Sequence, residues 1–148
     1  MGNVCFVPLQ GGEILEILPL APAGGINHSY TFLAGYEYEI RMASYLLTTN
    51  AVGGNRAPVF ELIDAAANLL WRICFSINTT ANELARFSLY VGCRRSNFSL
   101  IVAPNHYYND ALPAMRILPG CIFQSAFTGL NIGDLFSEIR FVCYRWRT

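Results

Sequence analysis

Residues 69–77 read Leu69-Leu70-Trp71-Arg72-Ile73-Cys74-Phe75-Ser76-Ile77. Every second side chain of this stretch is apolar, and Arg72, Cys74 and Ser76 fall between the apolar positions. A period of two residues is typical of a β-strand that buries one face and leaves the other accessible. The stretch therefore predicts a strand over residues 69–77.

The segment just before this strand has two possible structures. Residues 57–71 contain Pro58 near their start and an alanine triplet, which by propensity suit a helix. The alternative is a hairpin, with strands Val59–Ile63 and Leu69–Ile77 joined by a loop over Asp64–Asn68. The clean alternation after the loop favours the hairpin.

Alternating apolar residues recur along the chain and predict further strands. These are Glu13–Leu18, Tyr36–Met42, Leu84–Val91, Phe98–Val102, Met115–Leu118, Cys121–Phe127 and Glu138–Tyr144. In the second of them, Tyr38, Ile40 and Met42 are expected to face the core. About eight short strands, separated by Gly- and Pro-containing turns, predict an all-β fold. We expect one β-sandwich or jelly-roll-like domain.

Composition bounds the function. The 148 residues suit one domain, and ten basic residues balance ten acidic ones. All ten basic residues are arginine, which excludes chemistry that depends on a lysine, such as a P-loop or a Schiff base. Zero net charge argues against a nucleic-acid partner. Because 53% of the residues are hydrophobic and 14% charged, extensive contact with other protein chains is expected.

The N-terminal part differs from the rest. Residues 1–25 are rich in Pro and Gly and predict an extended arm, and residues 26–148 form the predicted sandwich domain. The apolar side chains of the arm have no evident partner strand: Val4, Phe6, Val7 and Leu9. Two interpretations stay open, an arm laid on a neighbouring subunit and an edge strand of the same domain.

Neither metal nor membrane signals are present. The five cysteines have no CxxC spacing, so we expect reduced thiols and no metal or other cofactor. The longest uncharged stretch, residues 17–36, is interrupted by prolines and glycines. It does not suit a membrane helix, and no membrane partner is expected.

Catalytic patterns are weak. No GxSxG sequence occurs, and Cys93 with His106 forms the one conceivable nucleophile–base pair. Glu37 and Glu39 lie on one face of a predicted strand, where a solvated charge row is a simpler interpretation than acid–base chemistry. We therefore expect that the protein is not an enzyme.

Arginines and aromatic rings gather at a few positions, which make up the candidate interface. These residues are Arg94, Arg95, Tyr107, Tyr108, Arg145 and Trp146. Such side chains can stack on bases or sugars, and they are also favoured at protein interfaces. The zero net charge favours a protein interface. A carbohydrate- or receptor-binding module that uses the rings of Tyr107, Tyr108 and Trp146 is the alternative.

Three stretches follow one another in an order that resembles a known group of proteins. They are Leu47-Thr48-Thr49-Asn50-Ala51 leading to Gly54-Asn55-Arg56-Ala57-Pro58, then Leu112-Pro113 with Leu118-Pro119-Gly120, and finally Thr128-Gly129-Leu130-Asn131-Ile132-Gly133-Asp134 before the last strand. This order resembles small all-β virion proteins of tailed bacteriophages, over residues 36–146. The resemblance assigns no catalytic residue.

The resemblance implies a structural role in a phage particle. The leading hypothesis is a capsid decoration or cement protein, made in the host cytoplasm and located on the surface of the virion. Its expected partners are the major capsid protein and further copies of itself, as a homotrimer. The alternative is a carbohydrate- or receptor-binding β-sandwich of a phage tail or fibre.

Overall fold

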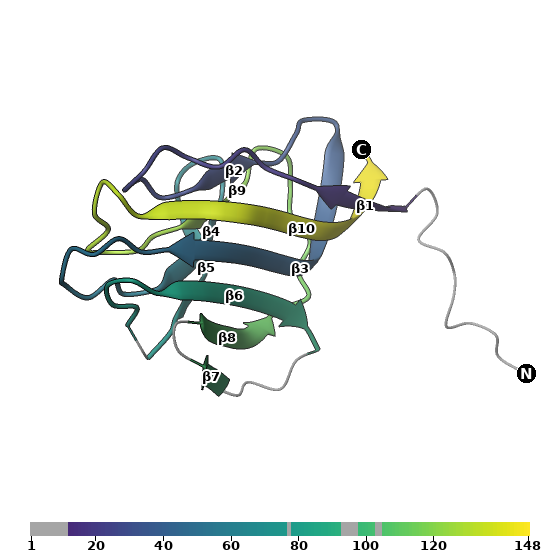
Figure 1. The fold of residues 1–148 in the computed structure, drawn as a ribbon. Coiled ribbons are helices and arrows are strands. Elements are labelled where there is room, and N and C mark those ends of the chain that lie inside the picture. The colour runs from purple at the N-terminus through teal and green to yellow at the C-terminus, as the bar shows by residue number, and fades with distance from the viewer. Residues whose placement is uncertain (1–11, 77, 93–97, 103–104) are drawn as a thin grey trace, which may run out of the picture.

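The computed structural model describes residues 12–76, 78–92, 98–102 and 105–148, which form two β-sheets (Figure 1). The ten strands are β1 (Glu13–Ile17), β2 (Ser29–Thr31), β3 (Tyr36–Thr48), β4 (Val59–Ile63), β5 (Leu69–Cys74), β6 (Leu84–Val91), β7 (Phe98–Val102), β8 (Asn105–Leu112), β9 (Ile122–Ser125) and β10 (Leu135–Arg147). No helix occurs in these described ranges. The predicted all-β sandwich is confirmed.

The two sheets differ in size and lie face to face. The larger has the order β1-β10-β3-β6-β8-β7, and the smaller has the order β2-β9-β4-β5. In Figure 1 the larger sheet lies in front of the smaller one. All neighbouring strands are antiparallel except β6 and β8, which run parallel.

The predicted hairpin over residues 59–77 is confirmed as β4 and β5. Asp64 fixes the loop between them, because its Oδ1 accepts hydrogen bonds from the backbone N–H groups of Ala66 at 2.9 Å and Asn68 at 2.8 Å. Such side-chain bonds to the backbone stabilise tight turns. Strand β5 ends at Cys74, earlier than predicted.

Aromatic rings from both sheets fill the core. Buried rings are Phe32, Tyr38, Tyr45, Phe60, Phe75, Phe87, Tyr108, Phe123, Phe127, Phe136 and Phe141. Phe60 of the smaller sheet lies 5.5 Å from Phe87 of the larger sheet, between ring centroids, and Phe123 lies 5.4 Å from Phe141. Both pairs are T-shaped, an arrangement that the ring quadrupole favours.

A bulge in β3 changes which side chains face outward. Ile40 pairs with Cys143 and Met42 pairs with Val142, so Arg41 is an extra residue in the ladder. Met42 also lies opposite Tyr90 of β6, on the face that points away from the smaller sheet. The prediction that Met42 faces the core is therefore wrong, whereas Tyr38 and Ile40 are buried as expected.

Part of the segment predicted as an extended arm, residues 1–25, is a strand. Residues Glu13–Ile17 form an edge strand of the larger sheet, with Glu13 opposite Arg145 and Ile17 opposite Phe141. Residues within the predicted arm thus belong to the sandwich. Val4, Phe6, Val7 and Leu9 lie outside the described residues.

Candidate interaction surfaces

The outer face of the larger sheet is the first candidate surface. In β3 and β6 the side chains of Ala43, Tyr45, Leu47, Ala85, Phe87 and Leu89 are buried against the smaller sheet. The residues between them point the other way, because successive strand residues alternate. The outward set is Ile14, Glu16, Glu37, Glu39, Met42, Ser44, Leu46, Leu84, Arg86, Ser88, Tyr90, Tyr107, Asn109, Arg140, Val142 and Tyr144. We call this surface the outer face.

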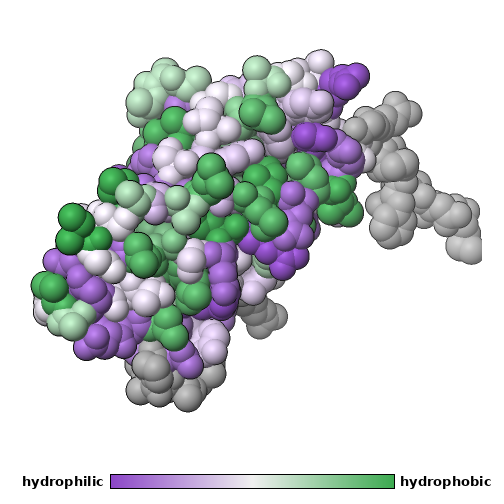
Figure 2. Space-filling view, turned by 45° about the horizontal axis from the view of Figure 1, so that its top comes forward, coloured by the Kyte–Doolittle hydropathy of each residue, from purple (hydrophilic) through white to green (hydrophobic). Residues whose placement is uncertain are grey.

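The outer face carries exposed apolar side chains between ion pairs. Ile14, Tyr90 and Tyr107 are among the exposed large apolar residues, and Tyr107 has 40% of its surface accessible. Figure 2 shows hydrophobic and hydrophilic residues interleaved on the molecule, seen after a 45° turn from the view of Figure 1. In the part of the chain that the structure describes, no strand covers this face.

The charged residues of the outer face neutralise one another. Arg86 lies 2.6 Å from Glu138, and Arg140 lies 2.8 Å from Glu16, in each case between nitrogen and carboxylate oxygen. Both pairs are accessible to solvent. A partner that docks here therefore meets paired charges between apolar side chains. The face does not present an electrostatic potential of one sign.

Guanidinium groups and rings gather where β3 and β10 meet at the outer face. Arg116 lies 5.0 Å from the ring centroid of Trp146 and 2.8 Å from the carboxylate of Glu37. Arg41 lies 5.5 Å from the ring of Tyr144. These distances allow cation–π attraction. The indole N–H of Trp146 is buried and has no acceptor among the described residues.

The second candidate surface lies at one end of the sandwich. We call three of its segments the loop end: residues 18–28, 49–58 and 126–135, the last of which includes Leu135 at the start of β10. Residues 78–83 lie beside the second segment, because the Thr49 N–H donates to the Glu83 carbonyl and Arg56 forms a bridge with Thr79. Arg56 and Asp134 join two of these loops through a bidentate ion pair, with nitrogen–oxygen distances of 2.9 and 3.0 Å. Both side chains are fully buried.

Further hydrogen bonds satisfy this buried pair. Arg56 also donates to the carbonyl oxygen of Gly54 at 2.8 Å and to the side-chain oxygen of Asn50 at 2.9 Å. Asp134 accepts from the backbone N–H groups of Asn50 at 2.9 Å and Asn131 at 2.7 Å. Burial alone would raise the pKa of Asp134, but hydrogen bonds from Arg56, Asn131 and Asn50 lower it below its ordinary value. The carboxylate therefore stays charged and fixes both loops.

Close backbone contacts hold the three loops together. A Cβ added to Gly24 would lie 2.2 Å from the carbonyl oxygen of Ile132, and one added to Gly129 would lie 2.2 Å from that of Asn55. Side chains cannot approach so closely, so the loops pack at glycine positions. The Gly25 N–H also donates to the Asp134 carbonyl at 2.8 Å. The loop end is a single packed unit.

The structure separates the candidate interface residues. Tyr107 lies on the outer face as an exposed ring, which agrees with its predicted accessibility. Tyr108 is only 1% exposed and stacks on Phe87 at 4.7 Å, so the prediction that its ring is accessible is wrong. Trp146 is also buried, with 8% exposed. The ring platform of the carbohydrate-binding alternative is thus not formed by these three residues.

Arg145 turns toward the interior side of the sheet. It lies opposite Tyr38, its guanidinium carbon is 4.3 Å from the ring centroid of Tyr36, and it is paired with Glu13. A hydrogen bond to Glu13 raises the pKa of Arg145 above its ordinary value. This arginine ties β1 to β10. Arg94 and Arg95 lie outside the described residues.

Each histidine has a hydrogen-bond or ion-pair partner in the described part of the chain. His106 lies 3.5 Å from the Glu83 carboxylate and 3.3 Å from the Tyr108 hydroxyl. Cys93, its conceivable nucleophile, lies outside the described residues. His28 is buried, and its Nδ1 is 3.0 Å from the Tyr45 hydroxyl. Burial lowers the pKa of His28 from 6.5 to about 4, so its ring is neutral near neutral pH.

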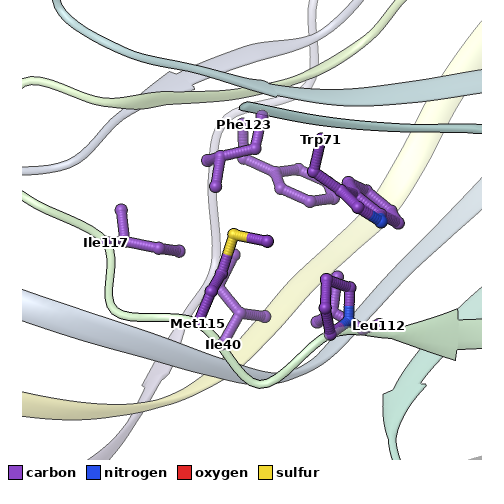
Figure 3. A pocket seen from close by; sticks show the side chains of 8 residues that line it. Ile40, Trp71, Leu112, Met115, Ile117 and Phe123 are labelled. Carbon is purple, nitrogen blue, oxygen red and sulfur yellow. The ribbon is translucent and has the colours of Figure 1, made fainter. Parts of the chain in front are cut away.

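An apolar pocket lies between the sheets but holds little space (Figure 3). Met115 and Trp71 point into it in the close-up, beside Phe123, Ile40 and Ile117. Its free volume is about 10 Å³. That is roughly the space of one water molecule, so the pocket is a packing defect and not a ligand site.

A wider hollow of about 420 Å³ opens between β5 and the end of β8. Arg72 and Asp110 are the charged residues on its described lining. Arg72 donates to Glu61 of β4 at 2.7 Å and is thereby held against the smaller sheet. The described lining of the hollow holds one carboxylate, whereas acid–base hydrolysis of glycosidic bonds uses two.

Across the described ranges, no group of three His, Cys, Asp or Glu residues is placed to hold a metal ion.

Arg56 and Asp134 were not predicted as partners. Their pairing joins residues 78 positions apart, and no local pattern indicates it. One signal was available: each is the sole charged residue of a long uncharged loop segment. Isolated charges in apolar surroundings need a partner when they are buried.

Comparisons with known proteins concern the fold. No family model and no curated sequence matches the chain. A protein of the infectious bursal disease virus particle aligns with 93% of this chain and 31% of its own length, at 10% identity and a TM-score of 0.38. Proteins of the Gx and Gt strains of that virus align with 90% of this chain, at 10% and 9% identity and a TM-score of 0.31 each.

This chain spans about a third of the first of these viral proteins and about two-fifths of the other two. No helix in the described ranges is long and apolar enough to cross a membrane.

Proposed function

We propose that this chain is a non-enzymatic structural protein of a bacteriophage particle, a decoration or cement protein that bridges neighbouring major-capsid subunits as a homo-oligomer. The observation that carries the proposal is the outer face of the larger sheet. It combines accessible apolar side chains with charges that are paired within the chain. The sequence resemblance to phage virion proteins supports the same role.

The chemistry of the outer face suits a protein shell as partner. Tyr90 and Tyr107 supply rings, which are enriched where proteins bind one another. The pairs Arg86–Glu138 and Arg140–Glu16 leave no unpaired charge of their own for a polyanion to neutralise. A sheet face that carries apolar side chains between paired charges is complementary to another protein surface of the same kind.

A lattice would strengthen such contacts. A shell presents the same site many times, and several linked copies can engage it at once. Modest affinity at each outer face then gives firm attachment to the particle. Synthesis in the host cytoplasm followed by addition to the virion surface agrees with this mode of binding.

The test is co-sedimentation with shells assembled from the major capsid protein encoded by the same virus. We expect the protein to sediment with the shells and Tyr90→Glu to weaken binding, because a carboxylate then meets an apolar partner. Leu70→Glu is the matched control, since Leu70 is an exposed residue of the smaller sheet. Absence of co-sedimentation, or loss of binding by Leu70→Glu and not by Tyr90→Glu, would contradict the proposal.

A further inference from the structure

The loop end exposes no charged side chain in its three loops. Residues 18–28, 49–58 and 126–135 contain two charged residues, Arg56 and Asp134, and both are fully buried against each other. His28, the remaining titratable residue of these loops, is also buried. The accessible surface of these three loops therefore consists of apolar side chains, amides, hydroxyls and backbone. Beside it, the Glu83 side chain is only 12% exposed and lies 3.5 Å from His106.

Large apolar side chains are exposed on these same loops. They are Leu18, Leu20, Ile26, Val52, Ile132 and Leu135. Leu20 is 91% exposed and Ile132 is 90% exposed. Several exposed apolar side chains on adjacent loops indicate a contact site, because exposed apolar area is otherwise unfavourable.

The exposed residues form one surface because their loops touch. The position of a Cβ on Gly24 is 3.3 Å from the Leu135 side chain and 2.2 Å from the Ile132 carbonyl oxygen. The position of a Cβ on Gly133 is 2.6 Å from the Asn50 side chain, and Asn50 accepts a hydrogen bond from Val52 at 3.1 Å. The ion pair below fixes these loops, so little conformational entropy is lost when the surface binds.

Charge selects the kind of partner. Nucleic acids and anionic lipid surfaces bind through cations, and these loops expose none. Contact between copies around a symmetry axis brings identical residues close together, where like charges would repel. Three loops without an accessible charge avoid that repulsion, whereas the outer face carries Arg86, Glu138, Arg140 and Glu16.

We propose that copies of this chain bind one another through the loop end, with Leu20 and Ile132 at the contact. This inference deepens the proposed function and rests on its homo-oligomer. It assigns self-association to the loop end and leaves the outer face free for the shell. The buried Arg56–Asp134 pair acts as the positioning element, because it shapes the loops without reaching the surface.

The test is the native mass by light scattering over a dilution series, for the wild type and for Ile132→Asp and Leu20→Asp. We expect a multimer for the wild type, and an upward shift of the dissociation midpoint by roughly two orders of magnitude for each variant, since like charges then meet. Leu118→Asp is the control, because Leu118 is exposed next to the Tyr38–Ile117 bridge, away from these loops. Thermal melting of each variant verifies its fold.

The outcomes separate this inference from the proposed function. A wild type that stays monomeric at every concentration, or folded aspartate variants with the wild-type mass, would overturn the inference. A dissociated Ile132→Asp variant that still sediments with shells, more weakly, supports both proposals. A stable wild-type multimer that ignores shells would overturn the proposed function and leave self-association intact.

Discussion

The loop end and the outer face handle charge in opposite ways. At the loop end, Arg56 and Asp134 are withdrawn from solvent and hydrogen-bonded on every side, and the surface above them is uncharged. On the outer face, Arg86 of β6 and Glu138 of β10 stay in solvent and pair across β3, which lies between their strands. The first arrangement shapes the backbone of three loops, and the second adjusts the charge of a surface that the strands already shape.

The energetic consequences differ accordingly. Removing one partner of a buried ion pair leaves an uncompensated charge in the interior, which is strongly unfavourable. Removing one partner of an exposed pair changes stability little, because water replaces it. Stability measurements should therefore rank the two regions, with loop-end substitutions having the larger effects.

The largest effect is expected for Asp134→Ala. It leaves the guanidinium of Arg56 buried without its carboxylate, and we expect the free energy of unfolding to fall by about 3–5 kcal/mol. Urea denaturation followed by fluorescence measures this change. The double variant Arg56→Met with Asp134→Leu removes both charges and should regain part of the loss. If Asp134→Ala lowers the free energy of unfolding by less than about 1 kcal/mol, this pair contributes no more than an exposed ion pair does, which would contradict the expectation.

Gly129→Ala comes next. At φ of 81° an L side chain is strained, and its Cβ would also lie 2.2 Å from the Asn55 carbonyl oxygen. We expect a loss of about 1–3 kcal/mol from the backbone conformation, and more from the clash. Gly35→Ala measures the backbone strain without a clash, because Gly35 has φ of 82° and nothing within 4 Å of its Cβ position. The difference between the two variants is then the cost of the clash at Gly129. Equal losses for the two variants would show that the loops do not pack at Gly129.

His28 gives the loop end a pH dependence. Its folded pKa is lowered to about 4 by burial, whereas in the unfolded chain it titrates near 6.5. The unfolded state therefore binds more protons between these values, and stability falls as the pH decreases through this window. The slope reaches at most about 1.4 kcal/mol per pH unit. His28→Gln should abolish the part of the slope above about pH 5, and an unchanged slope would assign it to another group.

The smallest effect is expected on the outer face. Glu16→Gln removes the exposed pair with Arg140, whose side chains are about half exposed, and should change stability by less than about 1 kcal/mol. The effect should shrink further at high salt, where exposed charges are screened. A loss comparable with that of Asp134→Ala would mean that the two regions do not differ as described.

Local pattern was enough to predict much of the fold. The strands β5 and β6 were predicted because their apolar residues alternate with polar ones, and β4 was predicted as the hairpin partner of β5. Strand β8 was not, because its inward residues include His106, Tyr108 and Asp110, which are polar and hide the alternation. Their polarity is tolerated inside because partners exist there, such as the Glu83 carboxylate beside His106.

Long-range geometry explains the misses. The bulge at Arg41 depends on the register against β10, so the orientation of Met42 cannot be read from β3 alone. Tyr108 and Trp146 were predicted as accessible rings, but ring chemistry does not distinguish a platform from a core residue. The pair of Arg56 and Asp134 exists only once two distant loops have met.

Hydrogen–deuterium exchange of the protein in dilute, concentrated and shell-bound samples tests the division of roles most directly. Concentration should slow exchange in residues 18–28 and 126–135, and shells should slow exchange in the larger sheet around Tyr90. The account would be contradicted if the protein were monomeric, if shells slowed exchange at the loop end, and if exchange on the outer face stayed unchanged in every sample.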